Sequence, residues 1–453
     1  MQQTIVAAAT PNAISALAVV RLSGPQAIEI AGRIFRPVSG RPLESLPGYH
    51  AAYGSFVTRD EVLDEGIVLV LRAPKSYTGE QMAELSCHGN PAITARLIAA
   101  CVAEGARPAA AGEFTRRAFE NGKIDLVQAE AVAELIESEG RAAAAAALAR
   151  RDGTLSREIG AVADALSYQA AELAMWADYP EEEDAPAVTR EGLEAALDQA
   201  KDVLEQLCRG YRSGQMLQNG IAVAIAGSPN VGKSTLLNRL CGEDRSIVTD
   251  IAGTTRDVVE GTAELDGVTV RLLDTAGIRQ TGDRIEQIGV DRAKRAIETS
   301  DLVLFLLDRS RPATEEERLL YQQVKNRPHL VVSNKIDLPE AAGAQIPPFA
   351  AVDVEISAET GDGIDRLSEK IRQVLGLNLT QDHCLIASQR QYSCVQRAAE
   401  ALDGAIAALR EGVTLDAVGV LLDEAIEPLA ELTGQKVSEA VLAQVFSHFC
   451  VGK

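Results

Sequence analysis

One short segment near the middle of the chain constrains the fold more than any other. Residues 227–234 read Gly-Ser-Pro-Asn-Val-Gly-Lys-Ser, the pattern GxxxxGK[ST], and they lie between a buried-type apolar run at 221–226 and a helical pattern. Backbone N–H groups of such a loop, together with the N-terminus of the next helix, form a cradle for phosphates. Lys233 would bridge the β- and γ-phosphates, and Ser234 would bind Mg²⁺. The segment predicts a P-loop α/β domain; a glycine-rich turn before a helix is the alternative.

Three later motifs, each at the end of a predicted strand, identify the nucleotide. The strand at 268–273 leads into Asp-Thr-Ala-Gly at 274–277, where the Asp would hold the Mg²⁺ shell and the Gly N–H would face the γ-phosphate. The run 330–333 leads into Asn-Lys-Ile-Asp at 334–337. The Asp337 carboxylate would accept from guanine N1–H and the exocyclic amine, a pattern that adenine does not offer. Ser357-Ala358 would contact the base edge, so the predicted ligand is GTP.

The predicted GTP-binding residues belong to these motifs or to the loop between the first two of them. They are Asn230, Val231, Gly232, Lys233, Ser234, Thr235, Thr249, Asp250, Ile251, Ala252, Gly253, Thr254, Thr255, Asp274, Thr275, Ala276, Gly277, Asn334, Lys335, Asp337, Ser357 and Ala358. Ile278 stands where Ras-like GTPases place a water-orienting Gln. An aliphatic side chain cannot hydrogen-bond water, so hydrolysis needs another polar group and another source of positive charge.

The flanking segments differ from the nucleotide-binding part in their hydrophobic period. Residues 1–118 alternate β-type runs (16–22, 66–71) with a helical run at 92–103, which predicts a small α+β domain. Residues 119–218 are helical: Ile159, Val162, Leu166, Leu173 and Trp176 fall on one face, and a helix is expected from Leu193 to about Leu207. The G domain spans 219–375, and helices return over 376–453. The predicted fold is multidomain, with an all-α domain interrupted by an inserted α/β P-loop domain of Ras-like type.

Charge and composition exclude several classes. The 453 residues carry a formal net charge of −21, which argues against a protein held on nucleic acid by bulk electrostatics. Residues 1–118 hold 11 basic and 10 acidic groups, so the excess of acidic groups lies in the rest of the chain. Any nucleic-acid contact must therefore be local. No apolar run reaches the roughly 18 residues that span a bilayer, and the start has no basic signal region. Seven cysteines without metal spacing indicate reduced thiols, and the expected location is the cytoplasm.

Two further motifs carry a resemblance. Residues 249–257 read Thr-Asp-Ile-Ala-Gly-Thr-Thr-Arg-Asp and, with Asn230, resemble bacterial GTPases of the Era and Der kind. The C-terminus, Phe-Cys-Val-Gly-Lys at 449–453, is preceded by Glu-Leu-Thr-Gly at 431–434. With a G domain inserted in helices and an N-terminal α+β block, the chain is identified as a member of the tRNA modification GTPase MnmE (TrmE) family, over nearly its whole length.

The resemblance implies how hydrolysis is supported. In this family the 249–257 loop coordinates K⁺, here through Asn230, Thr254 and the backbone of Thr249 and Ile251, in place of an arginine finger. Thr255 would join Ser234 on Mg²⁺. Glu286, twelve residues beyond Asp274, matches the family's water-orienting glutamate; a solvated charge on a helix face is its alternative. The implied catalytic set is Glu286, Lys233 and Cys450.

The resemblance also implies that the N-terminal domain, 1–118, binds a tetrahydrofolate derivative as one-carbon donor (5-formyl- or 5,10-methylene-tetrahydrofolate) and dimerises. The matching folate-binding residues are Arg21, Glu84, Lys123 and Lys453. Basic groups can pair with folate carboxylates, and a carboxylate can accept from pterin N–H groups. Cys450 is either a catalytic thiol or a small residue packed near the folate. Residues 12–16, Asn-Ala-Ile-Ser-Ala, replace a Gly-rich stretch of the family, which puts the conformation of this loop in question.

The implied function is GTP-driven modification of carbon 5 of the wobble uridine of certain tRNAs, giving an aminomethyl-type or carboxymethylaminomethyl-type group. It is carried out with an FAD-dependent partner of the MnmG (GidA) type, by a homodimer that is not held in a membrane. The rival hypothesis is a ribosome-assembly or RNA-associated switch GTPase without small-molecule chemistry. It shares every G motif, so the terminal pentapeptide and the lack of a basic RNA-binding domain beside the G domain separate the two.

Overall fold

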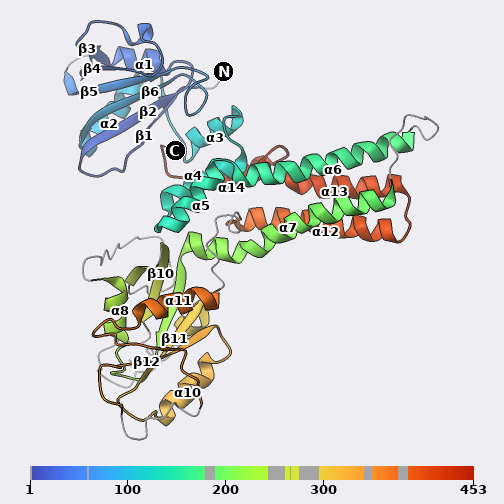
Figure 1. The fold of residues 1–453 in the computed structure, drawn as a ribbon. Helices are drawn as coiled ribbons and strands as arrows, with labels where there is room; N and C mark the ends of the chain where they lie inside the picture. The colour runs from blue at the N-terminus through green and yellow to red at the C-terminus, as the bar shows by residue number, and fades with distance from the viewer. Residues whose placement is uncertain are drawn as a thin grey trace. The chain divides into compact units, whose positions relative to one another are not determined.

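The computed structural model describes residues 3–58, 61–178, 189–242, 261–265, 267–274, 295–340, 349–375 and 386–452. Within the chain, contacts define two compact units. One comprises Met1–Ala133, Arg150–Val188 and Ala408–Lys453, and the other comprises Glu134–Ala149 and Thr189–Ala407. Figure 1 shows the helices and strands of both units.

The N-terminal domain is a seven-stranded sheet with the order β3-β4-β5-β6-β2-β1-β7. Neighbouring strands are antiparallel except β1 and β7. The strands are β1 (Ile5–Ala8), β2 (Ser15–Ser23), β3 (Phe35–Pro37), β4 (His50–Val57), β5 (Val62–Leu71), β6 (Met82–Gly89) and β7 (Arg107–Pro108). The helices are α1 (Ala27–Arg33) and α2 (Pro91–Ala103), with a 3₁₀ turn at Leu43–Ser45. The predicted α+β domain is confirmed.

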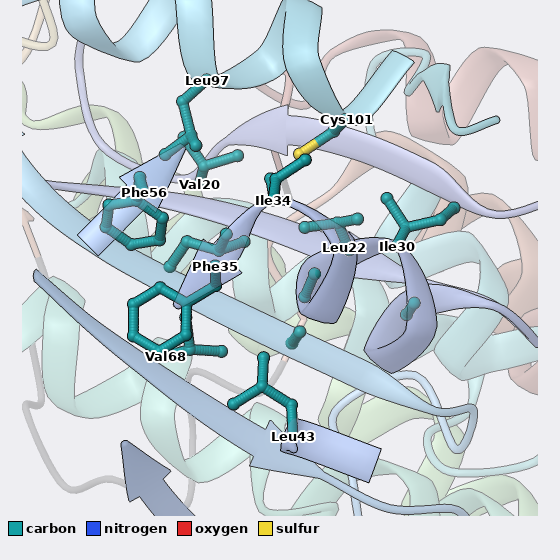
Figure 2. Close-up of a cluster of buried hydrophobic side chains, with 14 of the residues drawn as sticks. Val20, Leu22, Ile30, Ile34, Phe35, Leu43, Phe56, Val68, Leu97 and Cys101 are labelled. Carbon is teal, nitrogen blue, oxygen red and sulfur yellow. The ribbon is translucent and has the colours of Figure 1, made fainter. Parts of the chain in front are cut away.

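The main core of this domain lies between one face of the sheet and the helices α1 and α2. Strand alternation sends Ala18, Val20 and Leu22 of β2 to that face, where they are buried. Figure 2 shows Val20 and Leu22 in one cluster with Leu97 and Cys101 of α2. The rings of Phe35 and Phe56 lie in the same cluster, with their centroids 5.1 Å apart. Burial of two aromatic rings and a set of aliphatic side chains stabilises the packing of the helices on this face of the sheet.

The C-terminal tail packs in the same unit as this sheet. Helix α14 (Glu439–Ser447) contacts α3 (Glu113–Glu120) and α4 (Leu126–Glu137), and Phe446 and Phe449 are buried among their apolar residues. Gly112 has φ 66°, and a Cβ there would lie 2.7 Å from the Phe446 carbonyl oxygen, so only glycine fits. Val451 forms a β-bridge with Ala111. The last residues therefore lie against the segment from Ala111 to α4.

Long helices make up the all-α part. In the first unit α6 (Thr154–Asp178) packs along α13 (Leu415–Thr433), as Figure 1 shows. In the second unit α5 (Arg141–Arg151) precedes α7 (Arg190–Asn219), and α12 (Gln389–Arg410) lies beside α7, where Lys201 pairs with Asp403. There Tyr211 stacks on Tyr392 with ring centroids 4.4 Å apart.

Two helix predictions were wrong. The helix expected to end near Leu207 continues to Asn219, because Gly210 and Gly214 are buried in it and do not end it. Of the five residues predicted to form the apolar face of α6, Ile159, Val162, Leu166 and Leu173 are buried. Trp176 is 39% exposed. Trp176 lies at the margin of the stripe that Ile159 and Leu166 define.

The G domain is a six-stranded sheet with the order β13-β12-β11-β8-β10-β9, parallel except where β9 joins β10. The strands are β8 (Ile221–Ala226), β9 (Gly261–Leu265), β10 (Val268–Asp274), β11 (Leu302–Asp308), β12 (His329–Asn334) and β13 (Val354–Glu355). Helices α8 (Lys233–Cys241) and α11 (Ile364–Leu375) pack in one core, and α10 (Glu315–Val324) packs in another. Strand β11 was not predicted from the sequence.

The fold class predicted from the sequence is confirmed. An α+β domain comes first, and helices on either side of β8–α11 flank an inserted P-loop domain. Among the described residues, no helix is apolar over a stretch long enough to cross a bilayer. Cys87, Cys101, Cys208, Cys241, Cys394 and Cys450 are free thiols.

Candidate nucleotide and small-molecule sites

The first site lies at the carboxyl edge of the G-domain sheet. Strands β8, β10, β11 and β12 run parallel, so their ends meet at one edge. The register places Asp274 beside Ile225 and Asp308 beside Asn334. In open parallel sheets, ligands bind outside this edge. The described residues of the predicted motifs at the ends of β8, β10 and β12 are therefore gathered there.

The phosphate loop has the backbone that its sequence predicts. Gly232 has φ 99°, and a Cβ there would run into Nδ2 of Asn334, so glycine is required. Asn230 has φ 64°, a conformation that Asn tolerates better than most side chains. Lys233 is buried and donates from Nζ to the carbonyl oxygens of Gly227 (2.7 Å) and Ser228 (2.9 Å). Its ammonium group thus lies over the loop, while Ser234 is exposed in the first turn of α8.

The residues predicted to read the base are hydrogen-bonded directly to the loop of residues 227–234. Asn334 Nδ2 donates to the Val231 carbonyl oxygen (2.8 Å), and Asn334 Oδ1 accepts from the Ala358 backbone N–H (2.9 Å). Lys335 Nζ donates to the Asn230 carbonyl oxygen (2.9 Å). Three motifs that lie far apart in the sequence therefore form one surface. Asp337 is exposed just beyond them.

Asp308, at the end of β11, is a site residue that the sequence analysis missed. It accepts from Lys335 Nζ (2.7 Å) and from the Ser310 hydroxyl (2.6 Å). Burial alone would raise the pKa of the Asp308 carboxyl, but the hydrogen bonds from Lys335 and Ser310 outweigh it and hold the pKa below its ordinary value. The carboxylate therefore stays ionised at neutral pH and fixes Lys335. The apolar run before it, Leu302–Leu307, was the available sequence signal.

Several predicted residues of this site lie outside the described residues. They are Thr249, Asp250, Ile251, Ala252, Gly253, Thr254 and Thr255, then Thr275, Ala276, Gly277, and Glu286.

The second site is built around Arg21 and Glu84, which stand opposite each other in the pairing of β2 with β6. Arg21 Nε donates to Glu84 Oε1 (2.9 Å), and both side chains are largely buried. The Arg21 guanidinium also faces the rings of Tyr77 (5.5 Å to the centroid) and Phe114 (5.8 Å). The site thus combines a cation, a carboxylate and two aromatic rings.

The tail completes this site. Arg21 Nη1 donates to the Gly452 carbonyl oxygen at 3.4 Å. Gly452 has φ 101°, and a Cβ there would run into the Ala8 carbonyl oxygen, so the close approach to the residues of β1 requires glycine. Cys450 is exposed two residues earlier. Lys453 lies outside the described residues.

Lys123, three residues after α3, packs against the loop between β5 and β6 that carries Tyr77. Its Nζ donates to the Pro74 carbonyl oxygen (3.1 Å), and its side chain passes Gly79. Asn121 Nδ2 donates to the Thr78 carbonyl oxygen (2.7 Å). The loop therefore contacts Lys123 at Pro74 and Arg21 through the Tyr77 ring.

A buried ion network that the sequence analysis missed holds the same loop. Arg117 is 3% exposed and binds Glu80 (3.0 Å) and Glu113 (2.9 Å). The Ser23 hydroxyl donates to Glu80 (2.6 Å). A buried charge is tolerated when it is paired and hydrogen-bonded, as these groups are. Glu80 therefore fixes the loop, whereas Glu84, four residues later, faces Arg21.

The loop that lacks the family's glycines forms without them. Residues 11–16 are exposed, and none of them has a positive φ. The Val19 backbone N–H donates to the Thr10 hydroxyl (3.2 Å), which closes the loop. Ordinary backbone conformations are thus sufficient here.

Comparison with known proteins gives matches over the whole chain. Residues 4–123 match the family model described as the GTP-binding protein TrmE N-terminus, and residues 126–450 match the MnmE helical domain. The chain is similar to the tRNA modification GTPase MnmE of Aquifex aeolicus, at 40% identity over 100% of both chains. It is also similar to that of Thermus thermophilus, at 42% identity over 100% of both. A crystal structure of Aquifex aeolicus Era bound to GDP·AlF₄⁻ matches 40% of this chain and 65% of its own, at 32% identity and a TM-score of 0.27.

Proposed function

This chain belongs to the MnmE family of tRNA modification GTPases, and from that premise we propose the reaction that its two sites serve. It is a GTPase that acts in tRNA modification. GTP hydrolysis drives the addition of an aminomethyl-type or carboxymethylaminomethyl-type group to carbon 5 of the wobble uridine of certain tRNAs, in the cytoplasm and jointly with an FAD-dependent partner of the MnmG type. One observation carries the proposal: a guanine-type P-loop site and the tail-closed Arg21–Glu84 site occur in one chain.

The nucleotide site binds GTP through its backbone and a few side chains. The N-terminus of α8 and Lys233 bind the phosphates, and Asp337 with the Ala358 N–H reads guanine. Ser234 in the first turn of α8 and Asp274 at the end of β10 lie at the same edge of the sheet, which fits a Mg²⁺ site that Thr255 completes. When bound, Mg²⁺ neutralises charge on the β- and γ-phosphates.

K⁺ binding is proposed for the side of the loop that Asn230 occupies. The Asn230 backbone has a positive φ, and its carbonyl oxygen is held by Lys335. Its side chain is therefore presented by a fixed turn, which fits a ligand shared with Thr254 and the backbone of Thr249 and Ile251. When bound, K⁺ supplies positive charge near the developing phosphate charge. Glu286 orients the attacking water, the task that Ile278 cannot perform.

The Arg21–Glu84 site binds a tetrahydrofolate derivative. The donor set fits: Arg21 and Lys123 offer cations for carboxylates, Glu84 accepts N–H groups, and the rings of Tyr77 and Phe114 offer flat apolar surface. When bound, the folate supplies a one-carbon unit. The chain binds and orients the folate, and the C-terminal tail with Lys453 is proposed to close the site. The exposed Cys450 is the thiol proposed for catalysis.

Replacing Arg21 by alanine, or deleting Lys453, should weaken folate binding at least tenfold, because each change removes a charge-assisted contact. GTP hydrolysis by the G domain should be unchanged. Calorimetry with 5-formyl-tetrahydrofolate measures the first effect and phosphate release the second. Arg33→Ala is the matched control, since Arg33 is also ion-paired in this domain, on α1. Equal folate affinity in Arg21→Ala and wild type would contradict the assignment.

Two features support a homodimer whose parts respond to the nucleotide. The sheet face opposite α1 and α2 exposes Tyr53 (55%) beside Ile67 (45%), which favours a second copy docking through the N-terminal domain. In the second unit, the Ala142 N–H donates to the Gly267 carbonyl oxygen (2.9 Å) and Arg141 pairs with Glu264 (3.0 Å). Glu264 and Gly267 belong to the hairpin of β9 and β10, which lies between Thr255 and Asp274 in the sequence. Nucleotide-dependent changes in this hairpin would therefore reach α5.

Reconstitution tests the proposed reaction. Unmodified tRNA, GTP, K⁺, the folate and the FAD-dependent partner are incubated with the chain, and the wobble nucleoside is analysed by mass spectrometry. We expect a C5-modified uridine that requires GTP. Hydrolysis of GTP with unmodified uridine would contradict the proposal and favour a switch GTPase of the ribosome-assembly type. In Cys450→Ser, loss of modification with folate binding retained would support the thiol.

A further inference from the structure

The loop after β13 carries the residues that meet the guanine base. Ser357 and Ala358 are buried, at 0% and 2% exposure. The loop is a tight turn: the Ser357 N–H donates to the Asp362 carbonyl oxygen (2.9 Å), and the Gly361 N–H donates to that of Ser357 (2.8 Å). These bonds fix the shape of the turn. They do not fix its position relative to the phosphate loop.

Two residues from outside the turn hold it in place. Asn334 Oδ1 accepts from the Ala358 N–H at 2.9 Å. On the other side, Arg239 Nε donates to the Ala358 carbonyl oxygen at 3.2 Å, and Arg239 Nη2 donates to the Glu359 carbonyl oxygen. The planar guanidinium group presents its donors in a fixed fork, so two successive carbonyl groups are held together.

Arg239 lies on α8, the helix that begins with Lys233 and carries the phosphate loop at its N-terminus. A side chain of the phosphate-binding helix therefore sets where the base-binding turn lies. Guanine presents an acceptor, O6, where adenine presents an amino group. The Ala358 N–H already donates to Asn334 Oδ1, so it favours guanine only if the turn holds it where it can share its hydrogen with O6.

We propose that Arg239 is a positioning residue for guanine recognition, acting through the Ala358 backbone. It deepens the proposed function, because it rests on this site binding guanine nucleotides. The Ala358 N–H and Asp337 then read different ends of the base: Ala358 reads O6, and Asp337 reads N1–H and the 2-amino group. A defect in Arg239 should therefore affect only the discrimination that depends on O6.

The test measures dissociation constants of GDP, IDP and ADP for the full chain by competition with a fluorescent GDP. In Arg239→Gln we expect GDP and IDP to weaken together by about 3- to 10-fold, as for the loss of one or two hydrogen bonds, with ADP unchanged. IDP has O6 and lacks the 2-amino group, so the GDP-to-IDP ratio should stay at its wild-type value. Arg239→Lys, which keeps one donor and the charge, should recover part of the affinity.

The matched control is Arg366→Gln, an exposed arginine on α11 for which the structure shows no hydrogen bond. It should bind all three nucleotides as wild type does. The inference is overturned if Arg239→Gln binds GDP as wild type does, or if GDP, IDP and ADP weaken by one common factor. Absence of GDP binding by the wild-type chain would overturn the proposed function as well, which distinguishes the two failures.

Discussion

Replacing Asp337 by asparagine is expected to weaken GTP binding by about 10²–10⁴-fold. The carboxylate is proposed to accept two hydrogen bonds from guanine, and each bond to a charged group contributes about 1.5–3 kcal/mol. An amide turns one acceptor into a donor; its oxygen can still accept from N1–H, but its NH2 then faces the guanine 2-amino group, which is also a donor. Xanthine carries a carbonyl oxygen in place of the 2-amino group, so the amide can donate to it. Affinity for xanthosine nucleotides should rise as affinity for GTP falls.

Competition binding with GDP and XDP measures this exchange. Asp365→Asn, an exposed position in the first turn of α11, makes the same change of charge within the G domain and should leave both affinities unaltered. Unaltered GDP affinity in Asp337→Asn would show that Asp337 does not read the base.

GTP hydrolysis should fall by about 10²–10³-fold when K⁺ is replaced by Na⁺ at constant ionic strength, while GTP affinity changes little. The expected size is that of removing one transition-state charge contact. The nucleotide-binding motifs lack two groups that hydrolysis needs: Ile278 cannot orient water, and no arginine finger is identified in the motif sequence. Asn230 stands on a fixed turn at the phosphate loop, and cation binding by the 249–257 loop would also present a surface for a second G domain. Single-turnover hydrolysis in matched KCl and NaCl buffers measures the ratio.

The same account separates the cation from the catalytic glutamate. Glu286→Ala should abolish turnover and still permit K⁺-dependent pairing of two G domains, which light scattering detects. Glu298→Ala, an exposed glutamate whose loss changes the charge equally, is the control. Equal rates in K⁺ and Na⁺ would refute the role of the cation, and normal turnover in Glu286→Ala would refute that of the glutamate.

Local rules allowed the nucleotide site to be predicted from the sequence. Gly232 and Lys233 sit where a strand–loop–helix unit places them, and Asn334 ends a strand whose apolar residues are evident. Strand β11 was missed although its residues are apolar, and with it Asp308. Arg239 was missed for a different reason: its contacts lie 119 residues away at Ala358, and only the folded sheet brings α8 beside that turn.

In the second site, too, some residues could be predicted from the sequence and others depend on contacts that only the folded chain forms. Arg21 and Glu84 were assigned by resemblance, and the antiparallel register of β2 with β6 explains why they meet. The contact of Arg21 with Gly452 spans 431 residues and depends on how α14 packs on α3 and α4. The network of Arg117 with Glu80 gave no signal in the sequence, since charged residues on a short amphipathic helix usually face solvent.

The central claim is that this GTPase also holds a one-carbon donor, and titration of the intact wild-type chain with 5-formyl-tetrahydrofolate tests it most directly. Isothermal calorimetry should give saturable binding with one site per chain, in a preparation that also binds GDP. GDP binding without any folate binding would contradict the claim and leave a switch GTPase.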